Sequence, residues 1–214
     1  YRDIRPCPLI LSFSGLPYVD VRASLNSFIP ATLSDDVAKR LADAYVSILS
    51  DNPHYHDKIE FDVAFTVWTP EFLKYALGRL GPYNVTSDDI NQLESALKNI
   101  TCNALNSFKK TIDSINQLKK RRRSIELSNI SAEDKIFSLL DDCKRLGTLA
   151  FAHAARSGFV ATILLKGFVD VGVLTEERRL EFMRSITTVA GEFEKDKQQY
   201  SLGNLSLEDL LRLY

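Results

Sequence analysis

A long series of apolar residues at helical spacing, between residues 90 and 118, constrains the fold more than any other part of the sequence. The series consists of Ile90, Leu93, Leu97, Ile100, Ala104, Phe108, Ile112, Ile115 and Leu118. Steps of three and four place these side chains on one narrow stripe of an α-helix, as in a coiled coil. Thr86 or Ser87 is a suitable N-cap, and Asp88 and Asp89 suit the positive end of the helix dipole. The pattern therefore predicts one long helix.

A second long helix follows after a short link. Ser131 and Asp134 resemble a capping box at its start, and apolar residues then continue from Leu139 to Leu165. The second half of this helix is apolar on nearly all sides, which is typical of a helix at the centre of a core. Because the link is short, the two long helices are predicted to form an antiparallel hairpin.

Three stretches favour β-strands. Tyr18–Asn26 and Lys58–Trp68 alternate between apolar and polar side chains, which is the period of a half-buried strand. The apolar run Pro8–Phe13 precedes a turn sequence, so it predicts a hairpin with the first of these strands. Together with the helices, the strands predict an α+β fold that is mostly helical, with a long antiparallel helix hairpin and a small antiparallel β-sheet.

Shorter helices are predicted at Ser34–Ser50, at Pro70–Leu80, from Thr175 through Phe193, and after Ser206. We expect a single domain with two parts. Residues 1–84 contain the sheet and short helices, and residues 85–214 form a helical lobe. The sequence does not begin with Met, so we expect a middle domain excised from a longer protein.

Composition is that of an ordinary soluble protein, with 45% hydrophobic residues, 26% charged residues and a net charge of −1. This balance gives no bias towards nucleic acid or an acidic membrane surface. Cys7, Cys102 and Cys143 are sparse and widely spaced, as expected for reduced thiols in the cytoplasm. The longest apolar run, Phe159–Leu165, is too short to span a bilayer. We expect a cytoplasmic protein without a nucleic-acid or membrane partner.

Two sets of polar residues are candidates for binding. If the predicted strands share a sheet, Arg22 and Asn26 meet Glu60 and Asp62 on one face, a mixed-sign surface suited to a small zwitterion. The alternative is a solvated face with weak cross-strand ion pairs.

His153 and Arg156 form the second set, on one face of the apolar helix. A buried guanidinium must be paired. Arg156 therefore either pairs with an internal carboxylate or faces a cleft that receives a substrate carboxylate.

Other polar motifs carry less information. Lys119–Arg123 is either a phosphate-binding patch or, as we favour, a solvated helix end. His54 and His56 have no further ligand at a suitable spacing, so no metal site is predicted. The sequence contains no Walker A loop and no Rossmann glycine fingerprint, and no cofactor is expected in this chain.

Four longer segments resemble a known family: PYVDVRASLNSFIPATL, NPHYHDKIEFDVAFT, FAHAARSGFVATILLKGFVDVGVLT and LSLEDLLRLY. They are similar to the middle region of phosphotransferases related to phosphoenolpyruvate synthase and pyruvate phosphate dikinase. The most similar functional type is the L-glutamine kinase of bacterial capsule phosphoramidate biosynthesis. In that family, an ATP-grasp domain and a phosphohistidine domain flank the middle region.

The resemblance implies an acceptor-binding domain of an ATP-dependent kinase, with L-glutamine as the acceptor. ATP and Mg²⁺ are then expected for the full-length enzyme, and the isolated chain is expected to be inactive. None of His54, His56 and His153 matches the family's phosphocarrier histidine. The catalytic residues stay unknown. Two alternatives stay open: a related enzyme that acts on another small acceptor, and a non-catalytic helical scaffold.

Overall fold

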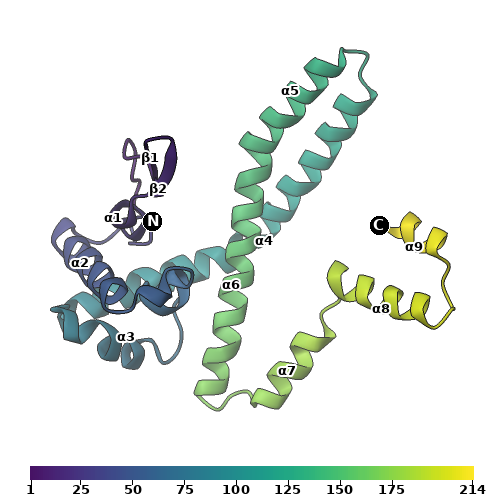
Figure 1. The fold of residues 1–214 in the computed structure, drawn as a ribbon. Helices are drawn as coiled ribbons and strands as arrows, with labels where there is room; N and C mark the ends of the chain where they lie inside the picture. The colour runs from purple at the N-terminus through teal and green to yellow at the C-terminus, as the bar shows by residue number, and fades with distance from the viewer. The chain divides into compact units, whose positions relative to one another are not determined.

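The computed structural model describes residues 1–214, of which 71% are helical. The chain divides into two compact units, Tyr1–Gly167 and Phe168–Tyr214, which are described separately. The predicted boundary between residues 84 and 85 therefore lies inside the first unit. The fold is α+β and mostly helical, with one small antiparallel sheet, as predicted (Figure 1).

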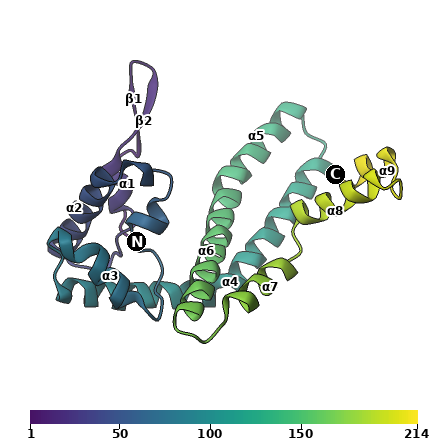
Figure 2. The ribbon, with the colours of Figure 1, turned by 60° about the horizontal axis from the view of Figure 1, so that its bottom comes forward.

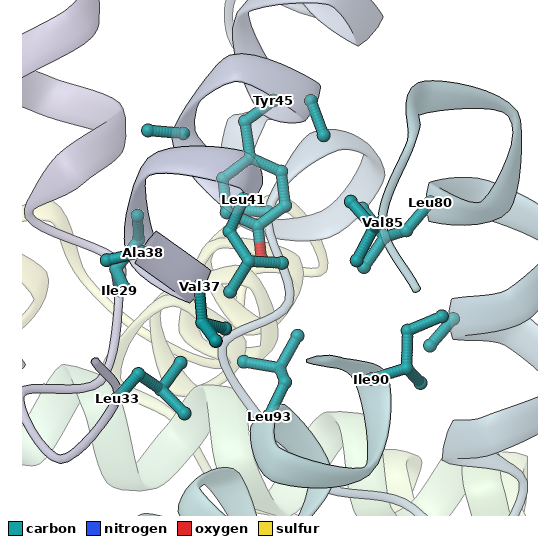
Figure 3. Packing of buried hydrophobic residues seen from close by; sticks show 14 of the residues in the cluster. Ile29, Leu33, Val37, Ala38, Leu41, Tyr45, Leu80, Val85, Ile90 and Leu93 are labelled. Atoms are coloured by element: carbon teal, nitrogen blue, oxygen red, sulfur yellow. The ribbon is translucent and has the colours of Figure 1, made fainter. Parts of the chain in front are cut away.

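The hydrophobic core of the first unit is built from the N-terminal helices. It combines α1 (Val21–Asn26), α2 (Asp35–Asp51), α3 (Phe72–Leu80) and the first third of α4 (Ser87–Leu127). Figure 3 shows Leu41 and Tyr45 of α2 packed with Leu80, Ile90 and Leu93. Two 3₁₀ turns, Pro53–Tyr55 (η1) and Gly81–Tyr83 (η3), connect these elements. This core confirms the predicted apolar faces of α2, α3 and early α4.

The predicted helix starts are confirmed because their caps form. Ser34 accepts a hydrogen bond from the backbone N–H of Val37 at the start of α2. Thr86 and Asp89 make a reciprocal capping box at the start of α4. Each cap satisfies N–H groups that have no partner within the helix.

The predicted helix hairpin also forms. From Leu127 the chain turns into α5 (Ala132–Asp142), then a π-helical turn, η4 (Cys143–Gly147), and α6 (Thr148–Asp170). The two views show α5 running antiparallel beside α4 (Figure 1, Figure 2). An ion pair between Arg121 Nε and Asp142 Oδ2, at 2.7 Å, joins the helices near η4.

The prediction that α6 occupies the centre of the core is wrong. Within it only Ala150, Val160 and Gly167 are buried, whereas Leu149 is 58% and Phe151 74% exposed. The N-terminal core contains no residue of α6, which instead contacts the segment from the π-helical turn η2 (Ile59–Val63) to α3 through Arg156, Phe159 and Gly167.

The apolar helical stretch in this region is longer than the run Phe159–Leu165 predicts. By length and composition alone, Ala132–Asp170 is long and apolar enough to cross a membrane, and 11% of its most apolar window is buried. The uninterrupted apolar run Phe159–Leu165 is short, but the longer stretch contains few enough charged residues to stay apolar on average. One such helix is weak evidence for membrane insertion.

Two strand predictions are wrong. The sheet contains only β1 (Ile10–Phe13) and β2 (Leu16–Val19), paired antiparallel with Ile10 opposite Val19. The rest of the predicted strand Tyr18–Asn26 is helix α1, because the Asp20 side chain caps it by accepting from Ala23 N–H, and Leu25 is then fully buried.

Lys58–Trp68 is not a strand either, since Ile59–Val63 forms a π-helical turn, η2. It has no strand to pair with, and Val63, Ala64 and Val67 are buried in an irregular segment instead. A period of two over a short stretch does not fix a strand unless backbone partners are available.

The second unit consists of α7 (Glu176–Ser185), α8 (Val189–Ser201) and α9 (Leu207–Leu213). The helix predicted from Thr175 through Phe193 is interrupted after Ser185, and Thr188 caps a new helix. The cap predicted at Ser206 is confirmed, since its hydroxyl accepts from Asp209 N–H. Phe193 and Tyr214 pack edge to face with their ring centroids 5.0 Å apart.

Asp89→Ala is expected to destabilise the first unit by about 3 kcal/mol, because Asp89 is 1% exposed and joins Arg40 to the α4 cap. These contacts lower the pKa of the Asp89 carboxyl to about 2, chiefly through the Arg40 hydrogen bond. Its contribution to stability is therefore present above pH 3.8 and is lost as pH falls towards about 2. Urea unfolding measures both effects.

The matched control is Asp88→Ala, which removes an exposed carboxylate from the same helical turn. It is expected to change the free energy of unfolding by less than about 1 kcal/mol. Equal losses in the two variants would contradict the role given to Asp89.

Candidate functional site

Arg156 is the functional candidate whose surroundings are most unusual. Its side chain is 19% exposed, and Nη2 donates a 2.7 Å hydrogen bond to the backbone carbonyl of Thr66. Nη1 lies 3.3 Å from Glu60 Oε1, which is long for a charge-assisted hydrogen bond. Arg156 Nε is buried and has no hydrogen-bond partner. The guanidinium is thus held in place but incompletely satisfied.

Residues distant in sequence build this environment. Helix α6 carries Arg156, while Glu60 projects from η2. The carbonyl of Thr66 also accepts a hydrogen bond from the Tyr1 hydroxyl, at 2.9 Å, and the Tyr1 ring lies 4.8 Å from the guanidinium carbon of Arg156. The same carbonyl therefore orients the guanidinium and the aromatic ring that covers it.

Burial affects both charged groups of the pair. It raises the pKa of the Glu60 carboxyl and lowers the pKa of the Arg156 guanidinium, because the charged form of each loses hydration. A weakly coupled acid and base that are both partly desolvated have the chemistry to bind a zwitterion, since a guanidinium can bond a carboxylate and an acid can bond an ammonium group.

A hollow of about 530 Å³ opens beside Arg156, between α4 and the η4–α6 segment. Its basic lining residues are Lys110, Arg121, Arg145, His153 and Arg156, and no Asp or Glu lines it. Asn103, Ser107 and Ser157 add amide and hydroxyl groups. We call this hollow the α4–α6 groove. Its polar lining favours a ligand that carries negative charge.

The structure brings together only part of the predicted set. Glu60 and Arg156 form an ion pair, and His153 lies with Arg156 in the α4–α6 groove. Arg22 instead pairs with Asp43 at 2.6 Å and, with Asn26, lines a different shallow hollow of about 560 Å³.

The shared sheet face that was expected to unite Arg22, Asn26, Glu60 and Asp62 does not exist, because α1 and η2 are helical. Asp62 lies near Arg79, whose pKa is lowered by burial and raised to a smaller extent by Asp62. The predicted zwitterion site on a sheet face is therefore wrong, because that face does not form, and the binding role of these residues stays a prediction.

Sequence reasoning missed Tyr1, Thr66 and Lys110. Thr66 acts through its backbone carbonyl, which has no sequence signature, and Tyr1 acts through a hydroxyl and a ring that reach Arg156 only in the folded chain. Lys110 lies on the polar side of the α4 pattern, where a solvated lysine is the ordinary expectation. Nothing in the sequence places these residues near Arg156.

Metal-ligating side chains do not cluster. No group of three or more His, Cys, Asp or Glu residues is placed to hold an ion. His54 and His56 lie at η1, where His56 Nδ1 is 3.2 Å from the carbonyl of Pro53.

Comparison of the chain with protein-family models, with curated proteins and with solved structures finds no match.

Glu60→Gln tests whether the pKa of the Glu60 carboxyl, which is paired with Arg156, is raised in the folded chain. A carboxyl whose pKa is higher in the folded chain binds its proton more tightly there, so its contribution to stability becomes less favourable as pH rises above 4.5. We expect the stability of the unsubstituted chain, relative to Glu60→Gln, to decrease between about pH 4 and pH 7. Urea unfolding at several pH values measures it, with Glu133→Gln on exposed α5 as the control. A difference independent of pH would contradict this assignment.

Proposed function

We propose that this chain is the acceptor-binding domain of an ATP-dependent phosphotransferase and that its acceptor is a small amino acid, with L-glutamine the first choice. The observation that carries the proposal is the half-buried Arg156, which is held by Thr66, is weakly paired with Glu60 and has an unpartnered Nε. The family resemblance of the sequence supplies the reaction class.

The chemistry of the acceptor supports this choice. Glutamine presents a carboxylate, an ammonium group and a side-chain amide. Arg156 is suited to the carboxylate and Glu60 to the ammonium, while Asn103 and Ser157 offer partners for the amide. Two or three such contacts, less the cost of immobilising the ligand, correspond to affinities of about millimolar to micromolar.

The proposed enzyme uses ATP and Mg²⁺ on flanking domains, an ATP-grasp domain and a phosphohistidine domain, and acts in the bacterial cytoplasm on a precursor of capsular polysaccharide modification. This chain supplies acceptor binding and no phosphoryl transfer of its own. The acceptor site is expected to be completed when a flanking domain closes over it.

A helical scaffold is the second candidate, favoured by a specific observation. Large apolar side chains project from the hairpin: Phe137 is 74%, Leu140 65% and Phe151 74% exposed. A scaffold that spaces or dimerises other domains would cover these residues and would bind no amino acid.

Arg156→Ala is expected to abolish L-glutamine binding to the 214-residue chain, since it removes the group assigned to the carboxylate. Titration calorimetry, or ligand-observed NMR at millimolar ligand, measures this. Arg22→Ala is the matched control, because it removes an exposed guanidinium that is paired with Asp43. Loss of binding in Arg22→Ala alone would place the acceptor on α1, and equal binding by all three proteins would refute both assignments.

The same two variants test the reaction in the full-length protein. Arg156→Ala is expected to lose phosphorylation of the acceptor while ATP-driven self-phosphorylation continues, because the flanking domains are unchanged.

Mg-ATP is expected not to bind the 214-residue chain, which lacks a phosphate-cradling loop. Micromolar binding of Mg-ATP to this chain, measured by titration calorimetry, would contradict the assignment of ATP binding to the flanking domains.

A further inference from the structure

We propose that the α4–α6 groove away from Arg156 is a second ligand site and that it takes an organic anion with an apolar body, such as an alkyl phosphate. This site shares the groove with the proposed acceptor but uses its other end: Lys110, Leu146 and Leu149 are assigned to the organic anion, whereas Arg156, Asn103 and Ser157 are assigned to the acceptor. Three observations lead to it: a hollow between two helices, an apolar floor, and an unpaired cation beside that floor.

The groove begins beside η4. Helix α4 packs against α5 and η4, and a Cβ on Gly147 would meet Leu118 at 3.6 Å, so the helices are close there. Beyond η4, a hollow lies between α4 and α6. A π-helical turn inserts an extra residue into the helical repeat, and such turns often occur at functional sites.

The walls and floor of the groove are largely apolar. Ile100 and Ala104 contribute from α4, and Leu146, Leu149 and Ala150 contribute from the opposite side. Ala150 is 5% and Thr111 4% exposed, so small residues at the base leave room above them. A ligand with an alkyl body would bury this surface and remove it from water.

The charged residues of the groove favour an anionic head group at the end of the ligand opposite its alkyl body. Arg121 pairs with Asp142 at 2.7 Å and Arg145 pairs with Asp141 at 2.8 Å, so two of the cations are already neutralised. Lys110 also lines the groove, makes no ion pair, and lies one helical turn after Ser107 on the same face of α4. No carboxylate lines the groove. An anionic head group placed on Lys110 would therefore meet attraction without a competing acid.

The probe is octyl phosphate, used below its micelle concentration and titrated into the 214-residue chain by calorimetry. Inorganic phosphate carries the charge alone, and 1-octanol carries the apolar body alone. We expect octyl phosphate to bind about tenfold more tightly than either, because each lacks one of the two interactions. Equal affinity for 1-octanol, or for inorganic phosphate, would overturn the proposed ligand class.

Two pairs of variants locate the site. Lys110→Glu is expected to weaken octyl phosphate binding about tenfold, whereas Lys109→Glu, the adjacent residue, which does not line the groove, is expected to change it less than about twofold. Ala104→Trp fills the groove and is expected to abolish binding, whereas Leu105→Trp, on an exposed position of the same helix, is expected to leave it unchanged. Circular dichroism of each variant verifies that the helices are intact.

Loss of binding in the control variants as well as in the groove variants would overturn the assignment, as would the absence of any binding. A separate arm uses vesicles with anionic phospholipid. If the chain sediments with the vesicles and Lys110→Glu sediments equally, a general membrane surface replaces the groove as the explanation. The acceptor proposal is tested through Arg156, so failure of one proposal is distinguishable from failure of the other.

Discussion

The carboxylate of Asp89 is the contact on which the arrangement of the first unit depends. It accepts two hydrogen bonds from Arg40 on α2, at 2.9 and 2.7 Å, and it closes the capping box with the backbone N–H of Thr86. One buried side chain therefore fixes both where α4 begins and how its first turn lies against α2. Because α4 is a single helix of 41 residues, that same contact sets the direction of the hairpin that carries the groove.

A second set of contacts holds α6 to the segment from η2 to α3. Phe159 and Phe61 pack edge to face with centroids 5.4 Å apart. At Gly167 an added Cβ would lie 3.3 Å from Pro70 and Thr69, so a larger residue there would force α6 away from the chain before α3. With Arg156 on the Thr66 carbonyl, these contacts join α6 to the irregular segment around η2. The candidate site therefore lies where the π-helical turn η2 and the irregular segment after it contact the long helix α6.

The helices were predictable from the sequence because local chemistry determines them. Ser34, Thr86, Ser131, Thr175 and Ser206 each cap the helix that follows, and the spacing of apolar residues gave the faces of α2 and early α4. Alternation over Tyr18–Asn26 does not produce a strand there, because the Asp20 cap and the burial of Leu25 stabilise a short helix over most of the same residues. Strand pairing depends on distant partners, and those cannot be inferred from period alone.

The candidate site was predictable only in part, for the same reason. An internal carboxylate partner for Arg156 was one of two expected outcomes, and Glu60 fills that role at 3.3 Å. That Arg22 would face Asp43 instead, or that Tyr1 would cover the guanidinium, depends on how α1 and the N-terminus pack. The sequence identified the residue types, and the tertiary structure decides which of them meet.

The guanidinium at position 156 stabilises the fold through the Thr66 carbonyl and the Tyr1 ring, but its burial also has a cost. A buried ion pair is often matched or exceeded in stability by apolar side chains of similar volume, and an unsatisfied buried donor costs about 1–3 kcal/mol. Arg156 has both features, since its Nε is unpartnered and its contact with Glu60 is long. Against a typical net stability of about 5–15 kcal/mol, that cost is considerable. Under the proposed function, a ligand carboxylate bonded to the guanidinium would offset part of this cost, which is why the acceptor is assigned to Arg156 and not to the exposed, paired Arg22.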